Sequence, residues 1–511
     1  MGKGWRYGLA CLSGALFVLS FPTFDLWPLG WVALIPLLVA IDGVKPKEGL
    51  KLGWICGAIY FSGMTYWILP LYPYANIPAV IAGMLLLTGY LSSYIAAFAW
   101  AVRWVDPRSG ISYALFCAAV WTALELIRGW LFTGLPWGSL GHSQYKNLPI
   151  AQIASITGVG GISFLMALTN ASIAHLLLNL KEWRSRIKTL ALPLALIALS
   201  LCYGLWTLAR PIDYKGEIKI ALLPGNVKQW EKMYVNPLRT FSKYLNLLDS
   251  VIPEKPDLIV MPETHVLMDL LNPANSSYLK LIQGKLRESG SYLLFGIPHT
   301  EEADGEYLDY NAAILLSPEG EVVGKYYKQH LVPISEYLPF RRYLPESIVR
   351  KVAGVADFAK GKEDVVFTLP NGARFGVVIC FESVFPNIFR RFIRKGVDFM
   401  GIITNDAWFE GTSAPYQHYA MAPFRAIETR KAIFRCANKG VTCVIDPKGR
   451  VISGVVKPDE DEVLIAELPL HPGTTIYARL GEWLPLSSLA GSLIYAFAKK
   501  HRRKQHAQGE I

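Results

Sequence analysis

Apolar residues are concentrated in the first 210 positions of the chain, where hydrophobic runs follow one another with short polar breaks. Most runs approach the roughly 20 apolar residues that a membrane-crossing helix needs. The first two runs are short and only FPTFDLWP separates them, so a re-entrant hairpin is the alternative for one of them. The pattern predicts seven transmembrane spans and an eighth near the C-terminus, at about residues 7–22, 27–42, 52–70, 78–102, 111–131, 152–180, 189–209 and 484–498.

A different pattern occupies residues 215–480, in which short runs rich in β-branched residues alternate with amphipathic segments. The strand-like runs are GEIKIALLP, PDLIVMPE, SYLLFGIPH, NAAILLS, EVVGKYYK, RFGVVICFES, DFMGIITND and VTCVIDPKG. Helical spacing occurs at residues 235–252, 275–289, 385–395 and 417–430. This alternation predicts a layered α/β domain. The predicted fold class is a multi-span α-helical membrane protein with an α/β domain, divided into residues 1–210, 211–483 and 484–511.

The overall composition agrees with this division, because 52% of the residues are hydrophobic, 18% are charged and the mean hydropathy is +0.29. An average soluble domain has about 45–50% apolar and about 25% charged residues. These values exclude a disordered or collagen-like chain. The seven cysteines show no metal-ligand spacing, so no zinc site or full disulfide framework is indicated. Cys436 and Cys443 flank a predicted turn, which leaves both a disulfide and two free buried thiols open.

The net charge of +11 is explained by membrane topology rather than by nucleic-acid binding. Sixteen basic residues lie in alternate breaks and termini, against Lys146 alone in the other short breaks. Basic residues of short loops stay in the cytoplasm. The odd number of preceding spans then places residues 210–483 on the far side of the membrane. The sixteen are Lys3, Arg6, Lys45, Lys47, Lys51, Arg103, Arg108, Lys181, Arg184, Arg186, Lys188, Lys499, Lys500, Arg502, Arg503 and Lys504.

Three reactive side chains stand at the ends of predicted strands: Glu263 after DLIVMP, Lys328 after GKYY and Cys380 after RFGVVI. A thiol becomes a good nucleophile when it is deprotonated, and a neighbouring ammonium such as that of Lys328 favours the thiolate. A carboxylate such as Glu263 can take the thiol proton as a general base. Lys328 can also stabilise an oxyanion, together with a backbone N–H after Cys380. Such a set is suited to acyl transfer through a thioester.

The surroundings of these residues, MPET, YYKQHLVPISEYLP and GVVICFESVFP, resemble the nitrilase (carbon–nitrogen hydrolase) superfamily with its Glu-Lys-Cys triad. With the predicted spans, ELIRGWLFTGLPW and NDAWF, the chain is similar over nearly its whole length to the apolipoprotein N-acyltransferase family. The resemblance implies an αββα sandwich, with Glu263, Lys328 and Cys380 as catalytic residues. It also implies supporting or substrate-binding roles for Trp230, Glu336, Phe381 and Glu382.

What the resemblance further implies is a ping-pong acyltransferase of the bacterial inner membrane with a periplasmic catalytic domain. Its acyl donor is a phospholipid, typically phosphatidylethanolamine. Its acceptor is the α-amino group of a lipoprotein's N-terminal diacylglyceryl-cysteine, and no cofactor, metal or nucleic acid is expected. The chain departs from the family pattern at Phe381, where many relatives have Tyr, and at Ile334-Ser335, where Phe-Gly is frequent. This chain therefore has no side-chain hydroxyl at position 381.

Other interpretations remain open on the sequence alone. A membrane-anchored amidase or nitrilase would use the same triad with water as the second nucleophile, and a transporter or receptor would carry a degenerate nitrilase-like domain. Glu125 and Arg128 lie one helical turn apart in the fifth span. This spacing indicates either an ion pair between them or contact with a substrate head group. The mixed apolar and basic stretch 337–360 predicts either an arm that dips into the outer leaflet or an ordinary loop.

Overall fold

The computed structural model describes residues 3–107, 110–235, 237–303, 305–339, 341–343, 345 and 357–508. The chain divides into two compact units. A helical unit contains Met1–Pro211, Thr412–Glu428 and Thr475–Ile511, and an α/β unit contains Ile212–Gly411 and Thr429–Thr474. Residues 346–356, within the stretch 337–360 for which an arm is an alternative, lie outside the described residues.

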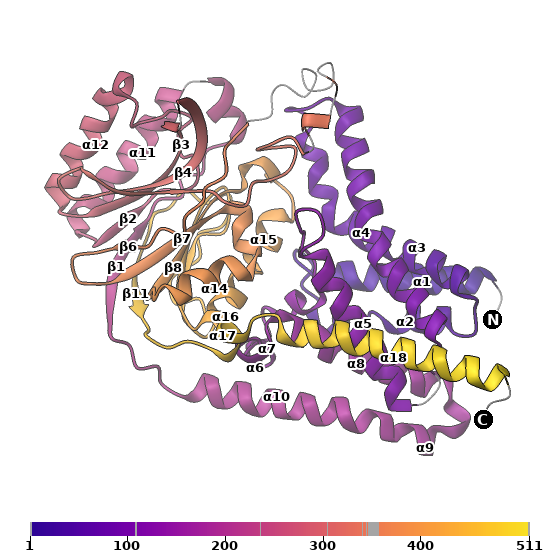
Figure 1. Ribbon diagram of the computed structural model, residues 1–511. Coiled ribbons are helices and arrows are strands. Elements are labelled where there is room, and N and C mark those ends of the chain that lie inside the picture. Colours follow the sequence, from indigo (N-terminus) through magenta and orange to yellow (C-terminus); the bar gives the residue numbers. More distant parts are fainter. Residues whose placement is uncertain are drawn as a thin grey trace. The chain divides into compact units, whose positions relative to one another are not determined.

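The helical unit is built from antiparallel pairs, in which α3 packs on α4 and α5 packs on both α8 and α18 (Figure 1). Five helical stretches are long and apolar enough to cross a membrane: Pro46–Leu71, Ile77–Val105, Gly110–Arg128, Val159–Leu178 and Ile187–Ala209. The helices are α1 (Lys3–Leu19), α2 (Ile35–Ile41), α3 (Pro46–Thr65), α4 (Ile77–Val105), α5 (Gly110–Arg128), α6 (Leu148–Ala151), α7 (Ala154–Thr157), α8 (Val159–Leu178), α9 (Trp183–Arg186), α10 (Ala191–Ala209), α15 (Ala414–Tyr419), α16 (Ala422–Thr429), α17 (Ile476–Leu480) and α18 (Trp483–Gln508).

Four of the predicted spans differ from the helices that form. The run 27–42 is a 3₁₀ turn, Trp27–Trp31, followed by the seven-residue α2, and α1 has 17 residues, so both are shorter than the five long stretches. The run 152–180 is broken at Gly158, whose φ of +68° suits glycine and where a Cβ would lie 2.4 Å from the Tyr477 ring. The helix α18 extends to Gln508, and its basic second half makes it less apolar than the five.

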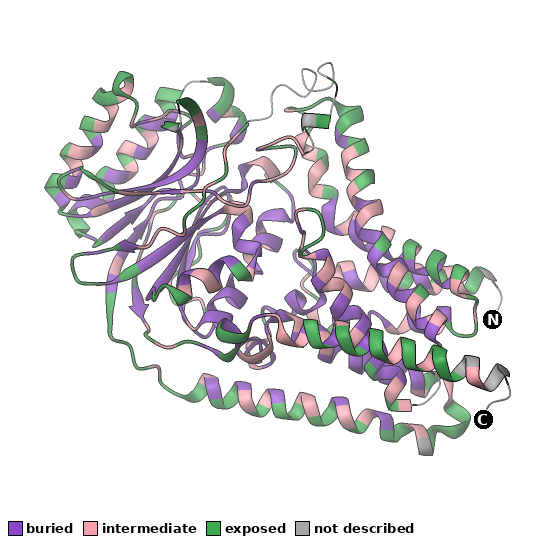
Figure 2. Cartoon of the chain, viewed as in Figure 1, coloured by how far each residue is buried: buried purple, intermediate pink, exposed green. Residues whose placement is uncertain are grey.

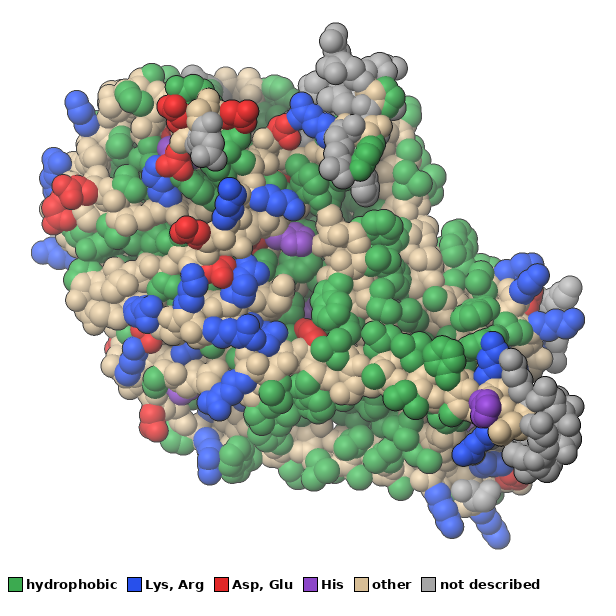
Figure 3. Space-filling view, viewed as in Figure 1, with side chains coloured by type: hydrophobic (Ala, Val, Ile, Leu, Met, Phe, Trp, Pro, Cys, Tyr) green, Lys and Arg blue, Asp and Glu red, His purple; other side chains and the backbone are tan. Residues whose placement is uncertain are grey.

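The outer surfaces of these helices are apolar, as expected for helices in contact with lipid. In the most apolar 18-residue stretch of Ile187–Ala209, 22% of the residues are buried, and Figure 2 shows α10 and α18 with many exposed residues. Hydrophobic side chains cover the visible face of the helical unit in Figure 3, whereas basic side chains gather near the chain termini. Large apolar side chains that are mostly exposed include Leu85, Leu86, Leu194, Leu199, Leu205, Ile494 and Phe497. Together these features describe a multi-pass membrane unit.

The α/β unit consists of two sheets packed face to face, with α11 (Pro237–Val251) and α12 (Ser276–Ser289) outside one sheet and α14 (Pro386–Arg394) outside the other (Figure 1). The six-stranded sheet has the order β11-β1-β2-β3-β4-β5 and the five-stranded sheet the order β10-β9-β8-β7-β6. Their bounds are β1 (Gly216–Leu222), β2 (Leu258–Val260), β3 (Tyr292–Ala303), β4 (Glu306–Leu316), β5 (Val322–Tyr327), β6 (Phe367–Thr368), β7 (Arg374–Ile379), β8 (Phe399–Asn405), β9 (Ala432–Asn438), β10 (Cys443–Ile445) and β11 (Leu464–Leu470). The predicted combination of membrane helices with an αββα sandwich is confirmed.

Three strands were not predicted. The strand β9 carries Arg435 in its middle, β11 mixes Glu467 with Pro469, and β6 has two residues, so none reads as a clean apolar run. The predicted helix 417–430 is two short helices, α15 and α16, which belong to the helical unit. Cys436 and Cys443 are both buried and free, so the disulfide alternative is wrong.

Strand direction decides where the chemistry gathers. The strands β7, β8 and β9 run parallel, as do β1, β2 and β3. Parallel strands bring their carboxyl ends to one edge of a sheet, where layered α/β folds place their sites. The residues that follow β7 and β8 therefore share one edge of the five-stranded sheet, and a hydrogen bond from Asn405 at the end of β8 to Glu263 brings the residues after β2 to the same region.

Candidate active site

The three predicted catalytic residues come together just beyond the strand ends. Glu263 lies three residues after β2, Lys328 follows β5 directly, and Cys380 follows β7. Glu263 is 5% exposed and Lys328 is 1% exposed, whereas Cys380 is partly accessible. Cys380 has a φ of +52° and begins the 3₁₀ turn Cys380–Val384. This sharp turn from strand to helix presents the sulfur at the strand end and leaves the first N–H groups of the turn without partners inside it.

The ammonium of Lys328 lies between two carboxylates. Its Nζ is 3.2 Å from Oε1 of Glu263 and 2.8 Å from Oε1 of Glu336. Burial disfavours the charged lysine, but the negative charges of Glu263 and Glu336 outweigh it and raise the pKa of Lys328 well above its ordinary value. Lys328 is therefore a fixed cation beside the nucleophile, able to face a developing oxyanion.

Asn311 is a central residue of this site that the sequence did not reveal. Its Nδ2 donates to Oε1 of Glu263 at 2.8 Å and to Oε1 of Glu336 at 2.9 Å, so it bridges the same two carboxylates as Lys328. The backbone N–H of Lys328 also donates to the carbonyl of Asn311 at 2.9 Å. In the sequence, Asn311 is visible only as an amide side chain at the start of the apolar run NAAILLS. In the structure, the pairing of β4 with β5 places Asn311 opposite the end of β5.

The second carboxylate oxygen of Glu263 is held by the other sheet. The backbone N–H of Asn405, the last residue of β8, donates to Oε2 of Glu263 at 2.8 Å. Gly296 on β3 packs closely behind, since a Cβ there would lie 2.6 Å from the Cα of Glu263. With donors on both oxygens, the carboxylate keeps one orientation, as a general base must.

The surroundings of Cys380 favour the protonated thiol over the thiolate. Burial raises the pKa of Cys380 above its ordinary value of 9.0, and the negative charge of Glu263 raises it further. Lys328 and a hydrogen bond with the Thr404 side chain lower it, as the sequence led us to expect for Lys328, but these two effects are smaller. The nucleophile must therefore give up its proton during the attack, and Glu263 is the carboxylate placed to receive it.

Glu382 organises the turn that carries Cys380. Its carboxylate accepts hydrogen bonds from the backbone N–H groups of Ile379 at 2.8 Å, Gln329 at 2.7 Å and His330 at 3.0 Å, and from the hydroxyl of Tyr326 at 3.0 Å. Burial raises the pKa of Glu382, and these donors together with Lys328 oppose the rise. Because the donors come from the segments next to both Lys328 and Cys380, Glu382 fixes the distance between the two.

The other residues implied by the family resemblance lie around this centre. The ring of Phe381 lies 5.6 Å from that of His330 in a tilted arrangement and 5.0 Å from that of Phe385 edge to face, so the position that lacks the hydroxyl is part of an aromatic cluster. Trp230 is 54% exposed and its ring lies 6.4 Å from that of Tyr234. Among the described residues, no hydrogen bond or ring contact joins Trp230 to the triad.

Lys232, two residues after Trp230, is buried and was not identified from the sequence. Its Nζ donates to the carbonyl of Thr264 at 3.0 Å, directly after Glu263. Burial lowers the pKa of Lys232 to about 7, while the charge of Glu263 acts in the opposite direction.

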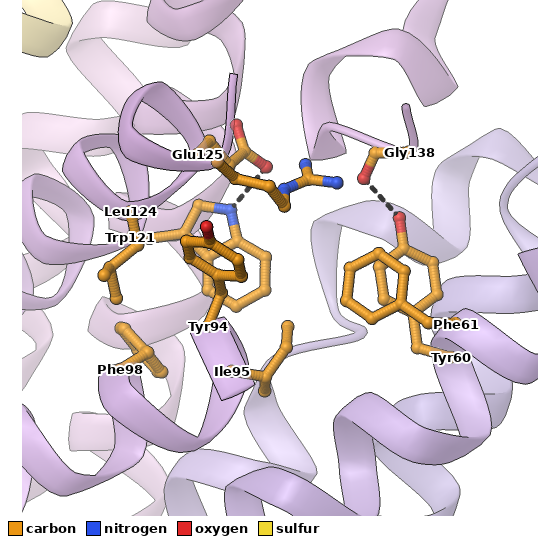
Figure 4. Close-up of a pocket in the computed structure, with 10 residues that line it drawn as sticks. Tyr60, Phe61, Tyr94, Ile95, Phe98, Trp121, Leu124, Glu125 and Gly138 are labelled. Atoms are coloured by element: carbon orange, nitrogen blue, oxygen red, sulfur yellow. Dashed lines mark hydrogen bonds between the residues drawn. The ribbon is translucent and has the colours of Figure 1, made fainter. Parts of the chain in front are cut away.

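A small cavity in the helical unit contains the acidic and basic residues of the fifth predicted span (Figure 4). Glu125 accepts hydrogen bonds from the indole N–H of Trp121 at 2.9 Å and from the backbone N–H of Leu140 at 2.7 Å. Arg128 donates to Ser139 Oγ at 3.1 Å. Within the part of the chain that the structure describes, no ion pair joins Glu125 to Arg128, so the expected pair is replaced by separate partners.

Comparison with known proteins agrees with both units. The family model described as the apolipoprotein N-acyltransferase N-terminal domain matches residues 13–172, and the carbon-nitrogen hydrolase model matches residues 216–475. The solved structure of Saccharomyces cerevisiae Nit3, a member of the nitrilase superfamily, aligns at 17% identity with a TM-score of 0.40, covering 51% of this chain and 93% of that one.

Two relatives match almost from end to end. The chain is 37% identical to the apolipoprotein N-acyltransferase of Geobacter metallireducens, over 98% of this chain and 96% of that protein. It is 33% identical to the apolipoprotein N-acyltransferase of Azotobacter vinelandii, over 99% of this chain and 97% of that protein. From this full-length likeness, the chain belongs to the apolipoprotein N-acyltransferase family.

Proposed function

We propose that the chain is an apolipoprotein N-acyltransferase that works by a ping-pong route through a thioester on Cys380. The acyl donor is a phospholipid, with phosphatidylethanolamine as the expected donor and its sn-1 chain as the group transferred. The acceptor is the α-amino group of the diacylglyceryl-cysteine at a lipoprotein's N-terminus, in the final step of lipoprotein maturation. The observation that carries this proposal is a buried Glu263–Lys328 pair beside the thiol of Cys380, in a chain with five membrane-length apolar helices.

In the first half-reaction, Glu263 takes the proton of the Cys380 thiol as the sulfur attacks the ester carbonyl carbon. The carbonyl electrons move to oxygen, and Lys328 with a backbone N–H of the turn after Cys380 stabilises the oxyanion. The intermediate then collapses with cleavage of the ester C–O bond. The leaving lysophospholipid alkoxide receives the proton from Glu263, and the acyl group remains on Cys380 as a thioester.

In the second half-reaction, the α-amino group of the lipoprotein attacks the thioester carbonyl. Glu263 removes a proton from the attacking nitrogen, and Lys328 again faces the oxyanion. Cleavage of the C–S bond releases the amide product, and the thiolate of Cys380 regains the proton from Glu263. The same carboxylate therefore serves as base and acid in both halves.

We infer the side of the membrane on which the reaction takes place from the distribution of basic residues. Sixteen basic residues in alternate loops and termini, against one in the other short loops, favour a bacterial inner-membrane protein with the α/β unit in the periplasm. Phospholipids of the outer leaflet are the acyl donors within reach on that side.

A membrane-anchored amidase or nitrilase-type hydrolase is the alternative, because it would form the same acyl-enzyme and pass the acyl group to water. The two are separated by supplying purified protein with phosphatidylethanolamine and a synthetic diacylglyceryl-cysteine peptide. We expect a triacylated peptide, visible as a gel shift, with little free fatty acid. Release of fatty acid at the same rate with and without the peptide would instead support the hydrolase.

A further inference from the structure

A hydroxyl group lies beside the nucleophile and has no part in the reaction described above. In the parallel pair of β7 and β8, Ile379 is opposite Ile403, so the next residues, Cys380 and Thr404, are neighbours across the two strands. Thr404 is fully buried, and its side chain lies close enough to the thiol of Cys380 to lower the pKa of that thiol.

The proton of the Thr404 hydroxyl is donated to another acceptor, Asp406. Oγ1 of Thr404 donates to Oδ1 of Asp406 at 3.0 Å, and Oδ2 of Asp406 accepts from Nη2 of Arg435 at 2.6 Å. Asp406 and Arg435 are both buried, and Arg435 is further fixed through Nε to the carbonyl of Val441 at 3.0 Å. A hydroxyl has one proton to donate and can turn about its C–O bond. Thr404 can therefore serve Asp406 or the sulfur, but not both at once.

We propose that Thr404 is a further catalytic residue whose hydroxyl proton turns from Asp406 to the sulfur of Cys380 whenever that sulfur carries negative charge. This inference rests on the proposed thioester route. The ion pair with Arg435 keeps Asp406 stabilised while it loses the Thr404 hydrogen bond, so the rotation leaves no isolated charge in the interior. A hydrogen bond to a charged sulfur is stronger than one to the neutral thiol, which gives the rotation its direction.

The need for such a donor arises twice in each cycle. During acylation the S–H proton passes to Glu263, and the sulfur is anionic until the C–S bond has formed. During transfer to the amine the C–S bond breaks, and the leaving sulfur holds the electron pair until Glu263 returns a proton. The charged groups that face the sulfur are Glu263 and Asp406, which oppose the thiolate, and Lys328, which favours it. The neutral hydroxyl donor of Thr404 adds to Lys328 in stabilising the thiolate of Cys380.

The test uses two pairs of full-length variants, in which each pair differs chiefly by one hydroxyl: wild type against Thr404→Val, and Thr404→Ser against Thr404→Ala. Two quantities are measured for each protein in detergent. The first is the rate of acyl-enzyme formation with phosphatidylethanolamine, from intact mass. The second is the pH profile of iodoacetamide alkylation of Cys380, which reports thiolate formation without any lipid.

We expect each variant that lacks the hydroxyl to form the acyl-enzyme about 10–100-fold more slowly than its partner, the value for one hydrogen bond to a charged group. We also expect its alkylation profile to move to higher pH. Equal rates and equal profiles within both pairs would overturn the inference while leaving the thioester route intact. If Thr404→Val does not fold, the Ser and Ala pair decides alone. Failure of the wild type itself to acquire an acyl group would contradict the proposed function instead.

Discussion

The bridging amide of Asn311 offers a quantitative test of how the two carboxylates are held. Asn311→Asp replaces a donor to Glu263 and Glu336 by a third acidic group of the same size. Two hydrogen bonds to charged groups, at 2.8 and 2.9 Å, are lost. Each contributes about 1.5–3 kcal/mol. If the whole loss appears in the barrier, acyl-enzyme formation slows by about 10²–10⁴-fold.

The assay is a time course of acyl-enzyme formation by intact mass, with phosphatidylethanolamine present and the lipoprotein peptide omitted. Asn311→Leu separates the lost hydrogen bonds from the added charge, and we expect it to be slow but faster than Asn311→Asp. Asn272→Asp is the matched control, because Asn272 is exposed and its side-chain oxygen accepts from the backbone N–H of Ala274 at 3.0 Å, which Asp also does. An Asn311→Asp protein that folds and acylates within threefold of wild type would refute the role given to this bridge.

Two further substitutions test the geometry of the site, and a reporter fusion tests the membrane topology. Glu263→Gln should stop acyl-enzyme formation. Alkylation of Cys380 at alkaline pH should stay as fast or become faster, because the negative charge of Glu263 raises the pKa of that thiol. Equal loss of both reactions would indicate that Glu263 has a structural role only. Lys232→Met should raise the melting temperature at pH 7, because burial holds the pKa of Lys232 at about 7 against an ordinary 10.5. Between pH 7 and pH 10.5 the Lys232 side chain is protonated in the unfolded chain but not in the folded one. The free energy of unfolding of the wild type should therefore rise with pH across this window, by up to about 1.4 kcal/mol per pKa unit. A wild-type stability that does not change with pH there would contradict this. A reporter fused after residue 215 should be active only in the periplasm, and cytoplasmic activity alone would contradict the topology and the substrates.

The parts of the fold that the sequence predicted are those with a strong hydrophobic period. The long helices and strands such as β7 and β8 have nearly continuous apolar runs, and β1 alternates Ile218 and Ile220 with polar residues, so their positions could be inferred without tertiary information. The strand β9 could not, because Arg435 interrupts its apolar pattern and its charge is paired with Asp406, 29 residues earlier. The break at Gly158 likewise depends on a distant residue, Tyr477.

The site divides along a similar line. Glu263, Lys328 and Cys380 were predictable because each is a reactive side chain at a strand end within a recognisable motif. Asn311 was not, because an amide at the start of an apolar strand becomes informative only when the fold brings two carboxylates to it. The direction in which the pKa of Cys380 is shifted also needed the structure, since burial and Glu263, which raise it, outweigh Lys328, which lowers it.

The central claim is that Cys380 carries the acyl group, and one measurement tests it most directly. Purified protein is incubated with a phosphatidylethanolamine whose sn-1 and sn-2 chains differ in mass, and the intact protein is then weighed before and after hydroxylamine treatment. We expect one adduct with the mass of the sn-1 chain, removed by hydroxylamine and absent from Cys380→Ala. An adduct of the same size and lability on the Cys380→Ala protein would contradict it.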